Sequence, residues 1–502
     1  MKIAYAQMKV AAGHPDINTE KILRLIGEAR AHGAEAVIFP EHAYTGDMLG
    51  STLFKKAFIQ DCVRHLHDIT SAASGLELLI CPDEDRDDDV EFFGYDVKYL
   101  TKPFSLSRSY DFEKIRLPRI QVGCVGVQNT GKTIYTFDGG SEVINSRGEV
   151  VQRAEPFAEC MNYVELEAID KMPALAPVDM PEVVKIHRAL KYGVKTFLEQ
   201  IGLQKVVIGV SGGIDSAVAA ALYVDVLGAE NVYLVNMPSV FNSATTKSLS
   251  ERLAKNLGCK YFVVPIQESV DWTVKQLEGV GVSVSSFVRE NIQARDRSSR
   301  ILAAIAAAVG GGFTCNANKA ESTVGYATLY GDEAGFMSAL ADLWKFQVYE
   351  LANYFNDEIF RSEVIPQGII DVVPSAELST AQNVDEGKGD PLKYPYHDYL
   401  LRAFVEQDAM PEDVLYWYAT GTLEAELGCG RGLVKKYFPT AQEFIADLER
   451  WWRQFTGMGV AKRIQSPPIL AVTDRPFGSF NESQNGVYFT RGYLELKARL
   501  LG

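Results

Sequence analysis

The residues best suited to chemistry stand in one short segment, residues 211–216, with the sequence SGGIDS. An apolar run rich in β-branched residues precedes it at 206–210, and an apolar run of small residues follows it at 217–222. This pattern predicts a buried strand, a tight turn and a helix, a geometry that points backbone N–H groups at an anion. Asp215 would repel a phosphate unless a divalent cation lay between them, so the segment indicates a nucleotide held with Mg²⁺. The lysine that defines a Walker loop is absent.

Further apolar runs are expected to form strands parallel to the first, at 232–235, 261–265 and 313–315. Helical patterns separate them, and this alternation predicts an α/β domain with a doubly wound parallel sheet. Ligands of such sheets bind beyond the carboxyl ends of the strands, where the SGGIDS segment would lie. Residues 316–335 include few apolar residues and three glycines, so we interpret them as a loop of the site rather than core. Glu321 in this loop could give the metal a second carboxylate ligand.

The first part of the chain carries a second α/β pattern. A strand is expected at 3–10, a helix at 19–32 and a buried strand at 36–39. Glu41 follows shortly after that strand. A carboxylate in this position is often catalytic, but from spacing alone an exposed loop glutamate is the simpler interpretation.

A linker is expected at residues 169–181, which contain three prolines. It would divide the chain into a domain at 1–168 and a domain at 182–502, and 502 residues leave room for both. The second domain would begin with an amphipathic helix that leads into the central strand. Residues 400–455 have helical spacing with one apolar face, which indicates a helical C-terminal extension.

Composition narrows the class of protein and its surroundings. The formal charge of −15 argues against nonspecific binding to nucleic acid. The seven cysteines have no paired spacing, which indicates a reducing compartment and no zinc site. The N-terminus lacks the apolar core of a signal peptide, and no stretch reaches 18 apolar residues. We therefore expect a cytoplasmic protein with small-molecule ligands and no membrane or nucleic-acid partner.

SGGIDS resembles the pyrophosphate-binding loop of the ATP pyrophosphatases, enzymes that adenylate a substrate and release pyrophosphate. With it, the motifs ENIQAR, NKAE, GYATLYGD, DLWKFQVYELA, PSAEL and AKRIQSPP occur in the order typical of NAD⁺ synthetases, over about residues 180 to 480. The resemblance implies a C–N ligase that uses ATP and Mg²⁺ to convert deamido-NAD⁺ to NAD⁺. ATP adenylates the nicotinate carboxylate, and ammonia then displaces AMP. Synthetase domains of this family pair, so a homodimer or higher homo-oligomer is implied.

The same resemblance implies roles for individual residues. Asp215 and Glu321 would bind Mg²⁺ and, with Lys345, are the implied catalytic residues. The implied ATP-binding set is Gly209, Ser211, Gly212, Gly213, Asp215, Ser216, Met237, Asn316, Lys345 and Ser375. The implied set for deamido-NAD⁺ is Asn291, Arg295, Asp332 and Lys462.

The front of the chain resembles the nitrilase-type amidase domain of the glutamine-dependent branch, through AVIFPEHAYTGDMLG and later VGVQNTGKTIYTFDGGSEVINSRGEVV. That family hydrolyses amides with a glutamate, a lysine and a cysteine. The thiolate attacks the carbonyl, the glutamate moves protons and the lysine stabilises the oxyanion. Glu41 matches the family's glutamate, and Cys81 lies in a segment that resembles the surroundings of its cysteine.

The family's lysine has no counterpart in the expected order. Lys55 and Lys56 lack its flanking pattern, and Lys114 has the pattern but follows Cys81. The acidic run DEDRDDDVE after Cys81 would also raise the pKa of its thiol. We therefore predict a shortened amidase domain without its own activity, retaining Glu41 and Cys81 as vestiges, and a synthetase that draws on free ammonia.

Three alternatives stay open at this stage. A lysine from an unexpected position could complete a glutamine-dependent enzyme. An amide ligase of the same fold could act on another carboxylate, since residues 316–318 and 473–478 depart from the family pattern. A nucleotide-binding pseudoenzyme is the non-catalytic alternative, and Asp215, Glu321 and Lys345 argue against it.

Overall fold

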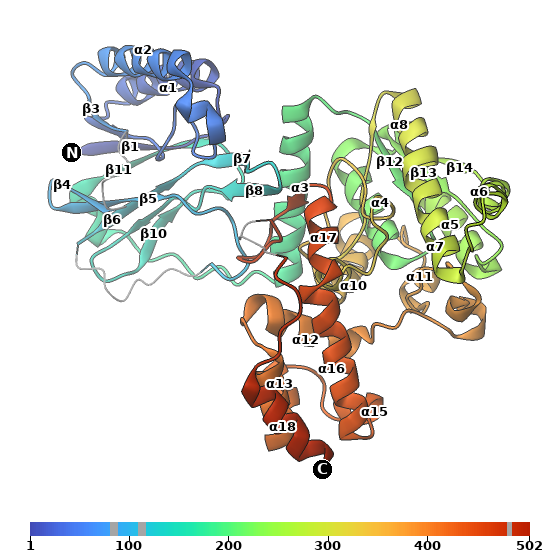
Figure 1. Cartoon of the computed structure of the whole chain (residues 1–502). Coiled ribbons are helices and arrows are strands. Elements are labelled where there is room, and N and C mark those ends of the chain that lie inside the picture. The colour runs from blue at the N-terminus through green and yellow to red at the C-terminus, as the bar shows by residue number, and fades with distance from the viewer. Residues whose placement is uncertain (81–88, 109–116, 479–483) are drawn as a thin grey trace. The chain divides into compact units, whose positions relative to one another are not determined.

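The computed structural model describes residues 1–80, 89–108, 117–478 and 484–502, and divides them into two compact units (Figure 1). The first comprises Met1–Phe197 with Ala471–Asp474, and the second Leu198–Leu470 with Arg475–Gly502. Helix α3 (Glu182–Ile201) begins in the first unit and ends in the second. The expected linker at 169–181 contains the end of the 3₁₀ helix η2 (Leu166–Lys171), followed by irregular chain. The boundary between the two compact units therefore lies after the expected linker, within α3.

The first unit is built on two sheets. The first sheet has the order β11-β1-β2-β3, with β11 antiparallel and the others parallel, and the second has the order β10-β9-β6-β5-β4. Strands β7 and β8 form an antiparallel hairpin. The strands are β1 (Lys2–Gln7), β2 (Ala36–Ile38), β3 (Glu77–Leu79), β4 (Asp89–Phe92), β5 (Tyr95–Leu100), β6 (Arg119–Gly123), β7 (Val125–Asn129), β8 (Thr133–Asp138), β9 (Glu142–Ile144), β10 (Val150–Arg153) and β11 (Cys160–Glu165).

The core of this unit follows from the alternation of side chains along β1. Ala4 and Ala6 face α1 (Pro15–Ala31) and α2 (Lys56–Ala72), which lie side by side over that face of the sheet (Figure 1). Ile3 and Tyr5 face the other way, into a cluster shared with β5, β6 and β9. Successive strand residues point to opposite faces, so one short strand contributes to two cores. The α/β pattern predicted for residues 3–39 is confirmed. Helix η1 (Gly50–Phe54) precedes α2.

The second unit contains the predicted parallel sheet, in the order β14-β13-β12-β15. Its strands are β12 (Val206–Gly209), β13 (Val232–Asn236), β14 (Lys260–Val263) and β15 (Gly312–Phe313). Val207 and Val235 face a cluster formed with α6 (Gln267–Gly279), the π-helix η4 (Asp296–Leu302) and α8 (Ala303–Val309). Helix α4 (Ile214–Leu227) contacts β12 and β13, and α5 (Ala244–Leu257) follows β13. The doubly wound α/β fold is confirmed.

The remaining helices of this unit continue around the sheet and into a helical extension. Around the sheet are η3 (Ala229–Asn231), α7 (Ser286–Arg295), α9 (Lys319–Val324), α10 (Lys345–Tyr354), η5 (Phe355–Ile359), α11 (Gln367–Asp371), η6 (Thr380–Gln382) and η7 (Val384–Glu386). The extension contains α12 (Tyr394–Glu406), α13 (Pro411–Thr420), α14 (Leu423–Leu427), α15 (Leu433–Tyr437), α16 (Ala441–Thr456), α17 (Met458–Gln465) and α18 (Arg491–Leu501), and the short strand β16 is Ile469–Leu470. The extension has its own core, which includes Leu400, Phe444 and Trp451.

One sequence interpretation in this unit is wrong. Residues 316–335 are not simply a loop, because they contain the buried helix α9. Asn318 caps this helix in a reciprocal pair with Glu321. Lys319 is fully buried, and its ammonium group lies 2.9 Å from Asp342 and 3.0 Å from Glu406. A polar helix can be buried here because its polar groups find partners.

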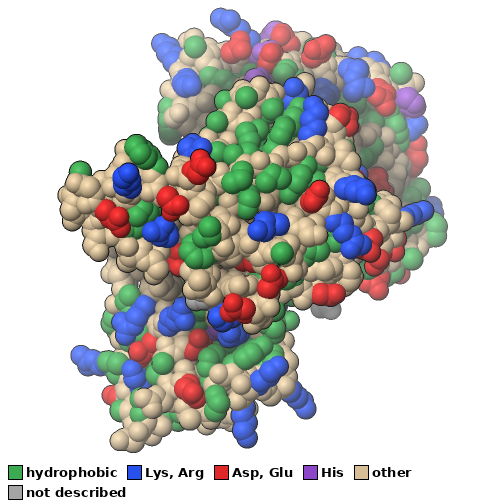
Figure 2. All heavy atoms as spheres, turned by 90° about the vertical axis from the view of Figure 1, so that its right-hand side faces the viewer, with side chains coloured by type: hydrophobic (Ala, Val, Ile, Leu, Met, Phe, Trp, Pro, Cys, Tyr) green, Lys and Arg blue, Asp and Glu red, His purple; other side chains and the backbone are tan. Residues whose placement is uncertain are grey.

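Exposed apolar side chains lie on the edge strand β14 and on two helices of this unit. Phe262 and Val263 are exposed on β14, and Trp272 on α6 and Phe287 on α7 are 61% and 70% exposed. Figure 2 shows hydrophobic side chains gathered on the face of the molecule that it presents. None of the helices in the described residues has the length and apolar character that crossing a bilayer requires.

Candidate active site

The turn between β12 and α4 forms the floor of the main cavity, which has a volume of about 270 Å³. Gly212 in this turn has φ +89°, in the left-handed region that side chains rarely adopt. A Cβ atom at this position would lie 2.3 Å from the backbone oxygen of Thr246 on α5. The conformation and the close approach both require glycine. The packing of this turn against α5 therefore fixes the position of the loop.

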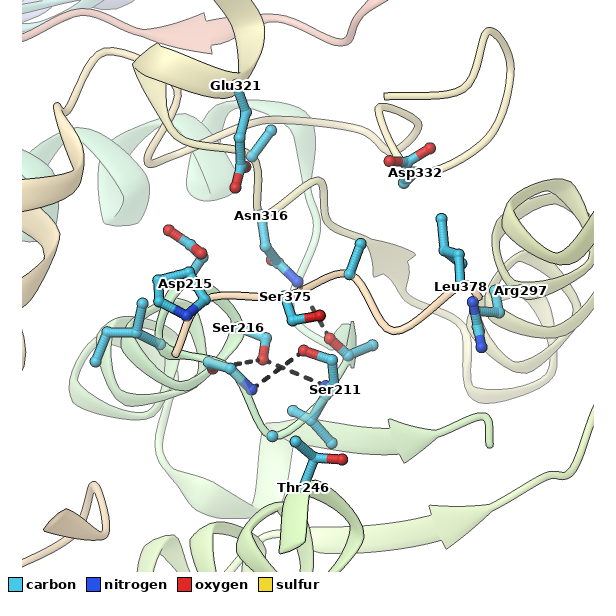
Figure 3. Close-up of a pocket in the computed structure, with 18 of the residues that line it drawn as sticks. Ser211, Asp215, Ser216, Thr246, Arg297, Asn316, Glu321, Asp332, Ser375 and Leu378 are labelled. Carbon is cyan, nitrogen blue, oxygen red and sulfur yellow. Dashed lines mark hydrogen bonds between the residues drawn. The ribbon is translucent and has the colours of Figure 1, made fainter. Parts of the chain in front are cut away.

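The loop presents donors to the cavity at the start of a long helix. α4 has 14 residues, and its N-terminus at Ile214 follows directly from Gly213. The Ser211 hydroxyl accepts a hydrogen bond from Gly213 N at 3.2 Å, and the Ser216 hydroxyl donates to Gly213 O at 3.1 Å (Figure 3). Free N–H groups and the helix dipole together favour an anion at this end of α4.

Two carboxylates and one ammonium group meet beside the loop. Lys345 Nζ, in the first turn of α10, lies 2.5 Å from Asp215 Oδ2 and 3.8 Å from Glu321 Oε1. Asn318 donates to Asp215 Oδ1 at 3.1 Å, and the Tyr394 hydroxyl donates to Glu321 at 3.2 Å. Burial and the negative charge of Asp215 raise the pKa of the Glu321 carboxyl. Burial lowers the pKa of Lys345, but the two carboxylates outweigh it, so the pKa lies above its usual value.

The donor set fits a magnesium ion shared with phosphate groups. Asp215 and Glu321 both lie around the position of one cation, that of the Lys345 ammonium group. No cluster of three or more His, Cys, Asp or Glu ligands is found in the described residues. Mg²⁺ is commonly held by one or two carboxylates, with phosphate oxygens and water completing its shell. The two carboxylates suit a metal that arrives with a nucleotide better than a permanent metal centre.

The structure brings most of the predicted site residues to one cavity. All ten residues of the predicted ATP set line it, and so do Glu321 and Asp332. The other three residues of the deamido-NAD⁺ set do not line the cavity. Asn291 donates to Phe287 O within α7, Arg295 donates to Leu329 O, and Lys462 donates to Gly325 O at 2.7 Å.

Arg297 is a cavity residue to which sequence analysis gave no role. It comes from the π-helix η4, an element often found at functional sites. Its guanidinium donates to Met237 O at 3.1 Å and to Asn242 Oδ1 at 3.2 Å. Burial lowers its pKa to about 10, so the group remains a cation near neutral pH. In Figure 3, Arg297 and Asp332 lie on the opposite side of the drawn pocket from Asp215.

The buried carboxylate of Glu377 stabilises the start of α5, the helix against which the loop packs. Glu377, at φ +46°, accepts hydrogen bonds from Thr246 Oγ1 at 2.6 Å and from Ser243 N at 3.2 Å. Asn242 donates to the same carboxylate and also accepts from Arg297. The network joins the PSAEL segment to the start of α5, which in turn packs against Gly212. In the sequence, the PSAEL motif indicates that this segment belongs to the site. Its spacing does not indicate which residues form hydrogen bonds with Glu377.

The first unit has a separate cavity of about 260 Å³ around Glu41. Its lining, in the described residues, is Glu41, His42, Asp47, Leu100, Thr101, Cys124, Gln128 and Phe137. No lysine is among them. Cys124, to which sequence analysis gave no role, is buried, and burial raises the pKa of its thiol to about 12. Cys81 and Lys114 lie outside the described residues, so their place relative to Glu41 stays a prediction.

The parallel sheet, the SGGIDS turn at its carboxyl edge and the paired carboxylates define a nucleotide-binding domain of the ATP-pyrophosphatase type. Comparison with known proteins makes this more specific. Residues 186–424 match the family model described as NAD synthase. These residues therefore form a domain of the NAD synthase family.

Two relatives from different bacteria carry the same name. A protein of Synechocystis named glutamine-dependent NAD(+) synthetase is 33% identical over 375 residues, covering 74% of this chain and 61% of the relative. A protein of Xylella fastidiosa with the same name is 27% identical over an alignment 559 positions long, covering 95% of this chain and 97% of the relative. The chain spans about three fifths of the length of the Synechocystis and Thermotoga maritima relatives, 61% and 59%.

Two solved structures share the fold over nearly the whole chain. The glutamine-dependent NAD+ synthetase of Acinetobacter baumannii, in complex with ADP, has a TM-score of 0.65 at 21% identity, with 96% of this chain and 98% of that chain covered. The corresponding protein of Cytophaga hutchinsonii has a TM-score of 0.76 at 14% identity, with 100% and 99% covered. The fold of a shortened nitrilase-like domain followed by a synthetase domain is confirmed.

Proposed function

We propose that the protein is an NAD⁺ synthetase that uses ATP and Mg²⁺ to amidate deamido-NAD⁺. The observation that carries this proposal is the convergence of the SGGIDS loop, Asp215, Glu321 and Lys345 on one cavity. The ADP in the Acinetobacter relative and the names of the relatives support a nucleotide-dependent ligase. A carboxylate resists attack by ammonia until one of its oxygens becomes a good leaving group, and adenylation supplies that group.

Each element of the cavity has a part in this reaction. The loop N–H groups and the N-terminus of α4 would hold the pyrophosphate portion of ATP. Lys345 would stabilise the negative charge that develops on the leaving pyrophosphate, and Arg297 would add a second fixed cation. Mg²⁺, when bound by Asp215 and Glu321, would neutralise phosphate charge. Preorganised cations act strongly here because the cavity wall is largely buried.

The identity of the acid that is adenylated can be tested by measuring the release of pyrophosphate from ATP. We expect release to depend on deamido-NAD⁺, because the remote dinucleotide portion supplies the binding energy that positions the carboxylate. Aspartate and xanthosine monophosphate should not replace it. Pyrophosphate release with another acid, and none with deamido-NAD⁺, would point to an amide ligase with a different substrate. No release with any acid would favour the pseudoenzyme.

The nitrogen donor is the finer part of the proposal. The names of the relatives support glutamine, which favours the alternative over the prediction of free ammonia alone. The cavity around Glu41 is lined by no lysine among the residues that the structure describes, but Cys81 and Lys114 lie outside those residues. We propose glutamine as the nitrogen donor on the evidence of the relatives, and retain direct use of free ammonia as the second candidate.

A comparison of ammonium chloride with glutamine separates the two candidates. NAD⁺ formation with ammonium is expected of both candidates, and the ammonia candidate further predicts a rate with glutamine that is lower by about a hundredfold, the effect of losing one oxyanion donor. Substitution of Cys81 or Cys124 by alanine should leave the ammonium reaction unchanged. Glutamine-driven NAD⁺ formation that disappears in Cys81→Ala would show that the first unit is a working amidase.

Pairing of two chains is also proposed. Exposed apolar side chains on β14, α6 and α7 are candidates for a surface that a second copy could bury. The homodimer stays a prediction that these side chains support. A cytoplasmic location is likewise proposed, since the six described cysteines are all free.

A further inference from the structure

Asp398 is a buried side chain that contacts the site through the backbone of a helix. It lies on α12 and is 1% exposed. Its Oδ2 atom accepts a hydrogen bond from the backbone N–H of Phe346 at 3.0 Å. Phe346 follows Lys345 directly, in the first turn of α10. Asp398 therefore binds the backbone one residue away from Lys345, whose ammonium group meets the two carboxylates of the site.

The first turn of α10 depends on acceptors from side chains. The first N–H groups of a helix have no acceptor within the helix itself. Trp344 N donates to the side chain of Gln347 at 2.9 Å, and Phe346 N donates to Asp398. Trp344 and Lys345 are buried, so this end of the helix is largely shielded from water. Without Asp398, Phe346 N would lose its acceptor, and the first turn of α10 would have to move to find another.

A second residue of α12 contacts the site directly. The Tyr394 hydroxyl donates to Glu321 Oε1 at 3.2 Å, and Lys345 Nζ lies 4.8 Å from the centroid of the Tyr394 ring. Tyr394 and Asp398 are four residues apart, so they lie on the same face of α12. This face of α12 therefore contacts both the side chain of Lys345 and the backbone that carries it.

Helix α12 is itself fixed by a buried histidine. His397 is fully buried, and its Nδ1 atom accepts a hydrogen bond from Lys393 N at 2.6 Å. The proton of the neutral ring then lies on Nε2, which donates to Asp447 Oδ2 on α16 at 2.9 Å. These two bonds connect the start of α12 to the helical extension.

Lys345 has little freedom to correct for a shift of its backbone. Its side chain is 3% exposed and contacts Asp215, Glu321 and the ring of Tyr394. Side chains in close-packed surroundings keep to one rotamer, so the ammonium group moves with the first turn of α10.

We propose that Asp398 is a positioning residue that fixes the first turn of α10, and with it the ammonium group of Lys345, for the adenylation step. This inference rests on the proposed function. Asp398 is not among the described residues that line the cavity, so it acts through Lys345 rather than on a ligand. The helical extension thereby takes part in the reaction, because α12 connects the core of the extension to the site.

The test is Asp398→Ala, measured as pyrophosphate exchange dependent on ATP and deamido-NAD⁺ well below the Tm of the variant. We expect the exchange rate at saturating substrates to fall by about tenfold or more, because misplacing a group by about an ångström has effects of this size. The KM for deamido-NAD⁺ should stay within about twofold of wild type, since Lys345 belongs to the predicted ATP set. Asp398→Asn keeps an oxygen that can accept from Phe346 N and should recover most of the rate. A rate in Asp398→Ala close to that of wild type would overturn the proposal.

A double-mutant cycle shows whether Asp398 acts through Lys345. Lys345→Gln alone should lower the exchange rate, because a charge that stabilises the leaving pyrophosphate is lost. Adding Asp398→Ala should lower the rate no further, since no ammonium group is then left to misplace. Equal losses from Asp398→Ala in the two backgrounds would give Asp398 a structural role alone and contradict the proposal.

The matched control is Glu424→Ala, which removes another carboxylate that binds the start of a helix in the same extension. Glu424 on α14 accepts hydrogen bonds from Gly432 N at 2.7 Å and from Val434 N at 2.9 Å, at the start of α15. We expect this variant to lose Tm and keep the exchange rate. An equal loss of rate in Glu424→Ala would mean that any destabilisation of the extension lowers activity, against a specific role for Asp398.

Failure of the proposed function is distinguishable from failure of this inference. Absence of exchange with deamido-NAD⁺ in the wild-type protein would remove the substrate assignment alone. The position of Lys345 is then judged from crystal structures of the ligand-free variants. In Asp398→Ala the ammonium group should lose its contact with Asp215, whereas in Glu424→Ala it should keep its distance of 2.5 Å. A Lys345 side chain that stays in place in Asp398→Ala would refute the positioning role.

A second variant serves if Asp398→Ala does not fold. Asp398→Ser then takes its place in each measurement, because its hydroxyl can hold a water molecule against the N–H group of Phe346. The expected losses and the outcomes that contradict them are the same.

Discussion

Asp215→Asn is expected to lower kcat by about a hundredfold or more, the scale of losing a preorganised charge at a reacting centre. The substitution keeps the side-chain shape but removes half of the negative charge that Asp215 and Glu321 offer to a metal. Steady-state NAD⁺ formation at saturating ATP and Mg²⁺ measures the effect. Turnover close to that of wild type would remove Asp215 from the proposed metal site.

The same substitution also disturbs the resting structure, and a control separates the two effects. Lys345 would lose the partner at 2.5 Å and keep only Glu321 at 3.8 Å, so the free energy of unfolding should fall. Kinetic measurements well below the Tm of the variant separate the two effects, because the variant is then fully folded. We expect kcat to stay low under these conditions. A kcat that returns to the wild-type value at low temperature would show that Asp215 acts only through stability.

Gly212→Ala is the second change with a large expected effect. It forces a Cβ atom into the left-handed region and within 2.3 Å of Thr246 O, so the loop or α5 must move. Backbone strain of this kind costs about 1–3 kcal/mol. The displaced loop should also lower kcat/KM for ATP by about a hundredfold, because misplacing groups by about an ångström has effects of that size.

Gly421→Ala is the matched control for this prediction. Gly421 has φ +74°, but a Cβ atom there would meet nothing within 4 Å. The variant therefore carries the backbone strain without the collision and without a change in the cavity. We expect Gly421→Ala to lose stability and keep kcat/KM for ATP. Equal kinetic losses in both variants would show that the loop position does not depend on its contact with α5.

The sequence predicted the structure best where consecutive residues both form a local element and belong to the candidate site. The run from β12 through the SGGIDS turn to α4 could be predicted because strand, glycine turn and helix are all encoded within a few consecutive residues. The same holds for the residues of the predicted ATP set, all of which line the cavity. Glu321, Asp332 and Lys345 come from other parts of the chain, and the order of the family motifs allowed them to be predicted.

Other features depend on partners that local pattern does not reveal. Helix α9 was interpreted as a loop because its lysine and glutamate are polar. Asp342 and Glu406, which are distant in the sequence, explain how Lys319 can be buried. Arg297 cannot be told from an ordinary surface arginine in the sequence, because only its place in the folded cavity distinguishes it. Sequence analysis gave Cys124 no role, because no spacing rule indicates that the junction of β6 and β7 brings it into the cavity with Glu41.

The contact between Lys345 and Asp215 has a consequence for the order in which ligands bind. The ammonium group lies against both carboxylates, so a bare divalent ion coming to them would have to displace it. With the proposed function, a nucleotide that arrives with its metal would bring phosphate oxygens to which Lys345 could turn as the metal binds the carboxylates. The contact would therefore disfavour free metal ions and favour a metal that enters together with the nucleotide.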